Sequence, residues 1–181
     1  MLQVRKQGGK IRKKRISLLF YRVTNMLKIY YLKDKKEYIK EIAILTQQEW
    51  GEKNLNAIQF EHKIKAKIEK IKQFFHNPYY CKLILVKDNQ LVGFISIFPT
   101  DGEERKDLFP WYATMYVKKE YRGKGYSKIL NDAILEEARK RNIKRLYLRT
   151  ELKNYYEKFG AHYMEKLNEK ENIYYFDLDL S

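Results

Sequence analysis

A glycine-bearing turn between an apolar strand and an amphipathic helix constrains this chain more than any other feature of its sequence. The strand covers 111–117, the turn reads Arg-Gly-Lys-Gly-Tyr-Ser over 122–127, and apolar residues then recur at helical spacing up to Arg141. The first backbone N–H groups of a helix have no partner within it, and the helix dipole places positive charge there. Glycines let such groups face an anion without an intervening Cβ. The turn therefore predicts a site that holds phosphate.

Apolar periodicity predicts a mixed α/β domain around this turn. Asp34 and Glu37 match a capping box at the start of the first helix. A tight turn between two apolar runs indicates a hairpin, and a polar loop with four acids follows it at 99–110. The predicted elements are, in chain order, a strand at 27–32, helices at 34–51 and 55–75, strands at 81–86, 91–98 and 111–117, the helix after the turn, a strand at 145–148, a short helix at 154–160 and strands at 161–167 and 173–180.

The composition is that of a folded domain with a sizeable core, since 44% of the 181 residues are hydrophobic and 15% are aromatic. The single cysteine, Cys81, excludes an internal disulfide and a cysteine-based zinc site, and it favours a reducing, cytoplasmic setting. No apolar run approaches the roughly 20 residues that cross a bilayer, so no membrane partner is predicted. His62, His76 and His162 stand singly, without the spacing of metal ligands, so no metal site is predicted.

The formal net charge of +15 raises the question of an anionic partner. Residues 1–25 hold eight of the 38 cations and no acid, which leaves 30 cations against 23 acids in 26–181. We interpret 1–25 as a basic extension to a single domain at 26–181. The extension is a flexible or weakly helical segment, or upstream sequence read in from an early start codon, since Met26 opens a sensible first strand. A nucleic-acid arm and a targeting peptide stay open, although interleaved aromatic residues are missing.

Two motifs together resemble the GNAT superfamily of acetyl-CoA-dependent N-acetyltransferases. The family's phosphate loop follows Arg/Gln-x-x-Gly-x-Gly/Ala, and Arg122, Gly125 and Ser127 occupy its three specified positions here. Asn154 and the run Tyr-Glu-Lys-Phe-Gly at 156–160 are similar to the family's later segment. A plain surface turn explains the first motif but not the second one that follows it at a fitting separation. The resemblance implies a mixed α/β fold with a mostly antiparallel central sheet flanked by helices, the GNAT-like acyl-CoA N-acyltransferase fold.

The resemblance covers residues 27–180 and implies roles for individual residues. Tyr156 would be the general acid that protonates the leaving thiolate, and Asn154 would hold the coenzyme arm. The strand backbone would pair with the pantetheine amides, and the turn would hold the diphosphate. Read alone, Tyr156 suits a packing tyrosine, Asn154 a helix N-cap, and Met115 and Val117 the core. The implied coenzyme-binding residues are Met115, Tyr116, Val117, Arg122, Gly123, Lys124, Gly125, Tyr126, Ser127 and Asn154.

The resemblance implies an N-acetyltransferase that moves acetyl from acetyl-CoA to a primary amine by direct attack. Transfer of a longer acyl group, or acetylation of a protein amino group instead of a small-molecule amine, stays open. Asp107, Glu41 and Glu49 are candidate general bases on the acceptor-side elements, with no preference among them. The alternative is a non-catalytic acyl-CoA-binding module or a basic module that docks nucleic acid through 1–25. The sequence identifies neither the acceptor nor the oligomeric state.

Overall fold

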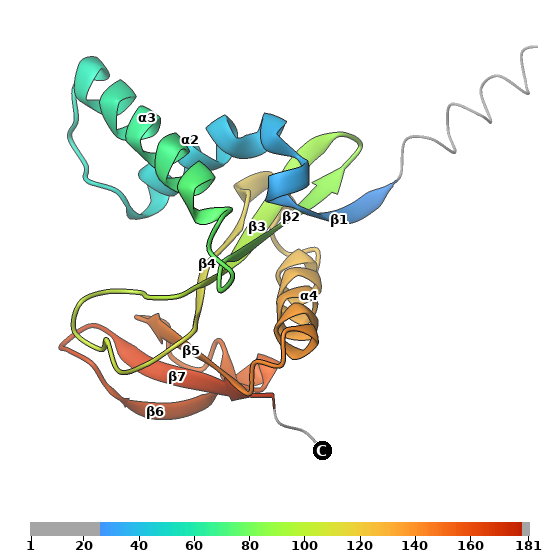
Figure 1. Cartoon of the computed structure of the whole chain (residues 1–181), viewed down its shortest axis with the longest axis vertical. Helices are drawn as coiled ribbons and strands as arrows, with labels where there is room; N and C mark the ends of the chain where they lie inside the picture. Colours follow the sequence, from blue (N-terminus) through green and yellow to red (C-terminus); the bar gives the residue numbers. More distant parts are fainter. Residues whose placement is uncertain (1–25, 179–181) are drawn as a thin grey trace, which may run out of the picture.

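The computed structural model describes residues 26–178, so the expectations about 1–25 lie outside the described residues. One seven-stranded sheet has the strand order β1-β2-β3-β4-β5-β7-β6 (Figure 1). Its strands are β1 (Leu27–Tyr31), β2 (Cys81–Lys87), β3 (Gln90–Phe98), β4 (Trp111–Val117), β5 (Arg145–Thr150), β6 (His162–Lys166) and β7 (Asn172–Asp177). The α-helices are α2 (Ile39–Trp50), α3 (Ala57–Phe74) and α4 (Tyr126–Lys140), and short 3-10 turns lie at Leu32–Asp34, Lys36–Tyr38, Lys119–Tyr121 and Glu157–Phe159.

The sheet is mostly antiparallel, as predicted. Only the neighbouring strands β4 and β5 run parallel. Both predicted hairpins are present, since β2 pairs with β3 and β6 pairs with β7. The β2–β3 turn is tight because Asp88 and Asn89 take φ angles of 51° and 61°, which two-residue hairpin turns need. The prediction of a mixed α/β fold with helices flanking the sheet is therefore confirmed.

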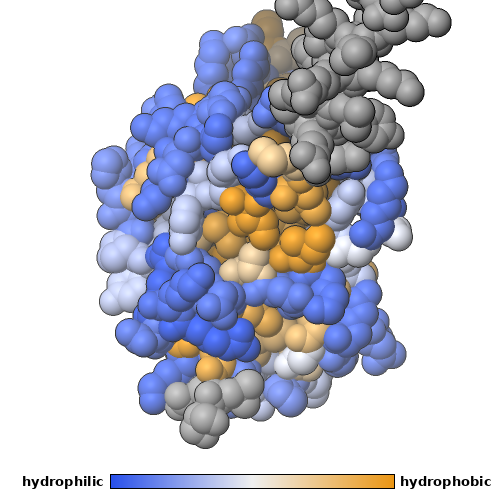
Figure 2. Space-filling view, turned by 90° about the vertical axis from the view of Figure 1, so that its right-hand side faces the viewer, coloured by the Kyte–Doolittle hydropathy of each residue, from blue (hydrophilic) through white to orange (hydrophobic). Residues whose placement is uncertain are grey.

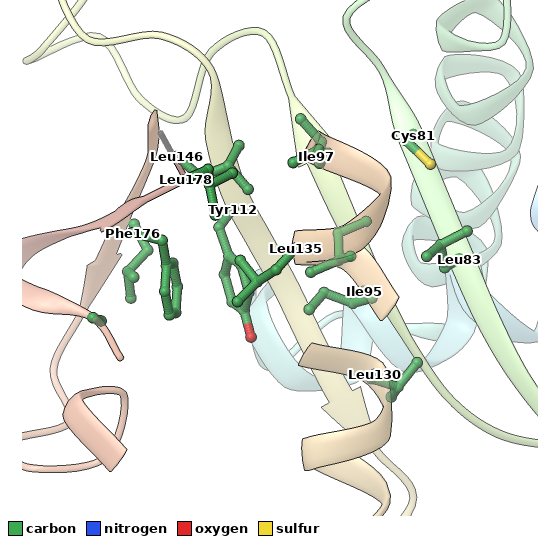
Figure 3. Close-up of a cluster of buried hydrophobic side chains, with 14 of the residues drawn as sticks. Cys81, Leu83, Ile95, Ile97, Tyr112, Leu130, Leu135, Leu146, Phe176 and Leu178 are labelled. Atoms are coloured by element: carbon green, nitrogen blue, oxygen red, sulfur yellow. The ribbon is translucent and has the colours of Figure 1, made fainter. Parts of the chain in front are cut away.

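Each face of the sheet has its own core, because successive strand residues point to opposite faces. Helices α2 and α3 cover one face and α4 covers the other (Figure 1). On the α2 side, Ile39 and Ile42 pack against Ile84 and Phe94 of the sheet. Figure 3 shows the α4 side, where Leu83, Ile95, Ile97, Leu130 and Leu135 lie together. Strands β2 and β3 are apolar on both faces for this reason, and the run in β2 is interrupted by one lysine, Lys82.

The capping box of this fold lies at α3 and not at the start of the first helix. The Asn56 side chain accepts from the Gln59 N–H at 2.9 Å, and the Gln59 side chain accepts from the Asn56 N–H at 3.0 Å. The prediction of a box at Asp34 and Glu37 is wrong. That segment forms two 3-10 turns separated by Lys35, whose φ of −134° and ψ of 57° are not helical, and α2 begins only at Ile39 without a side-chain cap.

Strand β4 carries a bulge that re-aims its second half. Phe94 pairs with Tyr116 but Ser96 pairs with Ala113, so β4 has one more residue than β3 in this interval. Thr114 lies in the bulge with a φ of 53°, a strained value for a β-branched residue. Its Oγ1 is held by hydrogen bonds to Ser96 Oγ at 2.8 Å and from Lys82 Nζ at 3.2 Å. The bulge fixes the direction in which β4 leaves the sheet.

The predicted short helix at 154–160 is a single 3-10 turn, Glu157–Phe159. Asn154 and Gly160 both take left-handed φ angles, 56° and 91°, and an α-helix cannot continue through such residues. After the end of α4, Asn142 likewise has a left-handed φ of 56°, which stops the helix.

The surface is mainly hydrophilic, in keeping with the 34% of charged residues in the chain. Figure 2 shows one face on which such side chains surround an apolar area. Among residues 26–178, no helix is long and apolar enough to cross a membrane. The same residues contain no cluster of three or more His, Cys, Asp or Glu that could hold a metal ion.

Candidate active site

The turn after β4 presents a row of unpaired backbone N–H groups. Gly123 and Gly125 both have a φ of 76°, a left-handed value that favours glycine, and Gly125 directly precedes α4. Within the described part of the chain, the amides of the five residues at 123–127 have no hydrogen-bond acceptor. Orphan amides are ordinary in the first turn of a helix, but here the preceding loop extends the row. Such a row at the positive end of a helix is suited to binding an anion.

Two cations lie beside this row. Arg122 Nε donates to the Val117 carbonyl at 2.9 Å, and the guanidinium carbon lies 5.7 Å from the centre of the Tyr116 ring. Lys124 Nζ donates to the Glu120 carbonyl at 3.2 Å. Neither side chain pairs with a carboxylate among residues 26–178, so their charges are not neutralised locally. The turn therefore combines directional N–H donors with two positive charges.

A cleft of about 360 Å³ opens next to the turn. Lys124 and Asn154 do not line it, and Asn154 is exposed. Tyr121, Leu152 and Tyr155 also line the cleft and were not assigned from the sequence, although Tyr155 lies within the later motif and Leu152 shortly before it. The structure brings together nine residues that the sequence predicted for the site: Met115, Tyr116, Val117, Arg122, Gly123, Gly125, Tyr126, Ser127 and Tyr156.

Strand β4 offers the cleft an open backbone edge. It pairs with β5 only at Trp111 and Tyr147, so the two strands diverge toward their C-terminal ends. On the side that faces β5, residues Met115 to Val117 have no strand partner, although the Val117 carbonyl accepts from Arg122. An extended ligand that carries amide groups can add to such an edge as another strand does.

Tyr156 lines the cleft as part of a cluster of tyrosines. Its ring centre lies 5.7 Å from that of Tyr112 and 5.0 Å from that of Tyr155. The Tyr112 hydroxyl donates to Asn131 Oδ1 at 3.1 Å, so this ring is fixed from α4. Burial, and to a smaller extent Tyr155, raises the pKa of Tyr156 to about 12. Tyr156 is therefore a protonated phenol at neutral pH, able to donate a hydrogen bond into the cleft.

The sequence model of the acetyltransferase (GNAT) family matches residues 39–161, well over half of the chain and including both motifs. The chain belongs to the GNAT acetyltransferase family. A search of curated proteins finds no match.

Solved structures agree with the family in fold. The PaiA N-acetyltransferase of Thermoplasma acidophilum, in complex with coenzyme A, has a TM-score of 0.58 and 19% identity over 84% of this chain and 99% of that one. A predicted acetyltransferase of Clostridium acetobutylicum with acetyl-CoA has a TM-score of 0.55 and 18% identity, over 76% and 90% of the two chains. Aminoglycoside 6′-acetyltransferase type Ii has a TM-score of 0.60 and 18% identity, over 85% and 99%. At these identities the likeness shows the fold.

Of the three carboxylates considered as bases in this GNAT protein, only Glu49 lines the cleft. It lies near the end of α2, exposed, and also lines the adjoining cavity. The Asp107 carboxylate accepts from Arg105 Nε at 2.9 Å and Nη2 at 2.7 Å, and these bonds lower its pKa. Glu41 pairs with Lys118 at 2.5 Å. Asp107 and Glu41 line neither the cleft nor its neighbour, so the structure separates them from Tyr156.

The adjoining cavity, of about 620 Å³, shares Glu49, Met115, Leu152 and Tyr156 with the cleft. It lies between α2, β4, β5 and the acidic loop at 99–110. Its lining includes the carboxylates of Glu49, Asp101, Glu151 and Glu171 and a single guanidinium, that of Arg149, which is paired with Glu104 and Glu171. Carboxylates therefore outnumber cations around it, which favours a cationic occupant.

Cys81 is only 3% exposed and lies in the core under α4 (Figure 3). Burial raises the pKa of its thiol to about 12, so the thiolate that a nucleophile requires does not form at neutral pH. His62, His76 and His162 are exposed and lie on different elements.

Proposed function

We propose that this protein transfers an acetyl group from acetyl-CoA to a primary amine. The observation that carries the proposal is the row of five unpaired amides at 123–127, which begins α4 and opens into the cleft. The coenzyme diphosphate binds these donors together with Arg122 and Lys124. Two relatives of the same fold were solved with coenzyme A or acetyl-CoA, which supports this choice of donor substrate.

The pantetheine arm extends along the open edge of β4 at Met115, Tyr116 and Val117 and leads the thioester to Tyr156. Its amide groups pair with the strand backbone, which accounts for the divergence of β4 from β5. The role of Asn154 on this arm rests on the family motif alone, because its side chain does not line the cleft.

The reaction removes two protons from the ammonium nitrogen, supplies one to the sulfur and releases the other to solvent. The acceptor arrives as an ammonium, and Glu49, between the cleft and the adjoining cavity, takes its proton directly or through a water. The amine nitrogen then attacks the thioester carbon. A C–N bond forms, the C–S bond breaks, and the nitrogen releases its second proton to solvent, while Tyr156 donates its hydrogen bond to the leaving sulfur.

Tyr156 contributes mainly as a hydrogen-bond donor to developing negative charge. With a pKa of about 12 it holds its proton more tightly than a thiol, whose ordinary pKa is about 8.5. With these pKa values, complete proton transfer from the Tyr156 phenol to the thiolate is therefore unfavourable. A preorganised hydrogen-bond donor in a water-poor cleft nevertheless stabilises the negative charge as it forms on the sulfur. The thiolate leaves and takes its proton from the phenol or, later, from solvent.

Direct attack is favoured over an acetyl-cysteine route because Cys81 lies in the core and outside the cleft. Among residues 26–178 there is no other cysteine to carry the acetyl group. A covalent route would require a nucleophile within reach of the thioester.

The test is release of free thiol from acetyl-CoA with a panel of primary amines, against the rate without amine, and with mass detection of the acetylated product. We expect thiol release that depends on the amine. If coenzyme binds but no amine accelerates thiol release, the non-catalytic acyl-CoA-binding alternative is correct. Salt-sensitive binding to nucleic acid that disappears when 1–25 are removed would instead support the basic module. Longer acyl-CoA donors in the same assay test the choice of acetyl.

A further inference from the structure

A buried lysine, Lys82, lines a third cavity, which borders the adjoining cavity; we call these two cavities together the acceptor region. This third cavity, of about 430 Å³, shares Thr46, Asp101, Ala113 and Thr114 with the adjoining cavity and is also lined by α3. Lys82, the one cation in the apolar run of β2, lines it while being only 5% exposed. Strand alternation explains its direction, because 82 shares the face of Ile84, which packs under α2.

Lys82 has no anionic partner. Its Nζ donates to Thr114 Oγ1 at 3.2 Å and lies 4.8 Å and 5.7 Å from the ring centres of Phe94 and Phe98. No carboxylate among residues 26–178 lies within ion-pair distance of it. A buried ammonium without a counter-charge is costly, so natural proteins rarely keep one without a use for it.

Further groups in the cavity also lack partners. Thr46 Oγ1 is buried and makes no hydrogen bond within the described residues. Lys67 and Lys70 line the cavity from α3 and form no ion pair among residues 26–178. Of the two acids that line it, Glu103 is paired with Lys106 at 2.6 Å, and burial raises the pKa of Asp101. The Lys82 end of the acceptor region is therefore rich in unneutralised positive charge and in hydroxyl donors.

The two ends of the acceptor region are thus opposite in charge. Near Tyr156 the carboxylates of Glu49 and Glu151 favour an ammonium, and at the far end Lys82 favours an anion. We propose that the acceptor is an amine that also carries a carboxylate, bound with its amino group toward Tyr156 and its carboxylate against Lys82 and Thr46. One buried ammonium and the unpartnered Thr46 hydroxyl match a single negative charge. This inference rests on the proposed acetyl transfer for the identity of the amino end.

The ionisation of Lys82 fits this role. Burial, and then the nearby charge of Lys67, lowers its pKa to about 7, so the empty site holds the ammonium only in part at neutral pH. The other titratable groups around it are Cys81 on its own strand, Lys70 on α3, and Asp101 and Glu103 on the loop. An arriving carboxylate stabilises the charged form, so its binding takes up a proton.

The first experiment measures binding without turnover. The full chain is titrated calorimetrically with straight-chain ω-amino acids of increasing length and with the matched alkylamines, in two buffers of different ionisation enthalpy. We expect the best amino acid to bind roughly tenfold or more tightly than its matched amine, with proton uptake. Lys82→Met should abolish both the preference and the proton uptake. Lys65→Met, which removes an exposed lysine paired with Glu61 on the same helix, should leave both unchanged.

The second experiment measures kcat/KM for thiol release with the same pairs of acceptors. The wild-type preference for the carboxylate should fall to about unity in Lys82→Met and to an intermediate value in Thr46→Val, the variant to use if Lys82→Met does not fold. Acetylation of amines without any preference for a carboxylate would overturn this inference and leave the proposed acetyl transfer standing. Lys82-dependent binding of carboxylates without acetylation of any amine would support the carboxylate site at Lys82 and overturn the proposed acetyl transfer.

Discussion

The two sides of the cleft are built in different ways. The proposed coenzyme side uses backbone groups from one continuous segment, 115–127, where a strand edge, a turn and a helix start follow each other. The proposed acceptor side uses side chains that the fold collects from separate elements: Thr46 from α2, Lys82 from β2, Asp101 from a loop and Thr114 from β4. The bulge at Thr114 links the two sides, since it re-aims Met115 to Val117 and also holds Lys82.

This difference separates what is general from what is specific. Backbone N–H groups bind any diphosphate of the right shape, so one local geometry serves a whole family of enzymes with a common donor. Side chains from distant elements can change one at a time, and they determine which acceptor is taken. The comparison predicts that variants on the two sides affect different measurements.

The largest effect is expected from Gly125→Asp on the coenzyme side. The new carboxylate would face the diphosphate, and a side chain is strained at a φ of 76°. Coenzyme affinity should therefore fall at least about a hundredfold, as measured by calorimetry. Gly160→Asp is the matched control, because Gly160 has a φ of 91° with open space around it and does not line the cleft. Equal affinity in the two variants would remove the turn from the site.

Tyr156→Phe should act on turnover alone. Removal of the hydrogen-bond donor at the leaving sulfur should lower kcat roughly tenfold to a hundredfold with coenzyme affinity unchanged, as seen by comparing steady-state rates with calorimetry. Tyr163→Phe, an exposed tyrosine on β6, provides the control for loss of a hydroxyl. An unchanged kcat in Tyr156→Phe would show that this phenol only packs against Tyr112.

The geometry of the turn could be predicted from the sequence because its information is local. The spacing of Arg122, Gly123 and Gly125 between an apolar strand and a helical run is enough to place orphan amides at a helix start. Local reasoning was wrong at Asp34, where 3-10 turns replaced the expected first turn of the helix. It was also wrong for the helix at 154–160, since Asn154 and Gly160 adopt left-handed conformations.

The acceptor side could not be predicted in this way. The cavity at Lys82 exists only once β2, β4 and α3 have been brought together. These elements are separated in the sequence, and no hydrophobic periodicity indicates that they meet. One signal was present, a lysine in an otherwise apolar run on a strand that is buried on both faces. Polar residues within such runs have to find partners in the folded protein, so they are worth following to the cavity that they face.

Lys82→Met sharpens the comparison through stability. The pKa of Lys82 is lowered from 10.5 to about 7 on folding, so between these values the unfolded chain binds a proton that the folded protein does not. The unfolding free energy of the wild type should therefore rise with pH across this window, and that of Lys82→Met should not show this rise. Near the lower end of the window the variant should be the more stable by about 2 kcal/mol, measured by urea unfolding. A less stable variant would mean that Lys82 is a paired structural residue.

The smallest effect is expected from a change in α3, the helix that lines the cavity at Lys82. Asn56→Ala removes the capping box of α3, the helix that carries Lys67 and Lys70, and should lower the unfolding free energy by about 1 kcal/mol. Coenzyme affinity should stay the same, because α3 contributes nothing to the cleft beside the turn. Asp34→Ala is the control, since Asp34 is exposed and caps no helix, and its stability should equal that of the wild type in the same urea titration. A loss of stability in Asp34→Ala but not in Asn56→Ala would restore the cap expected from the sequence and contradict the one in the structure.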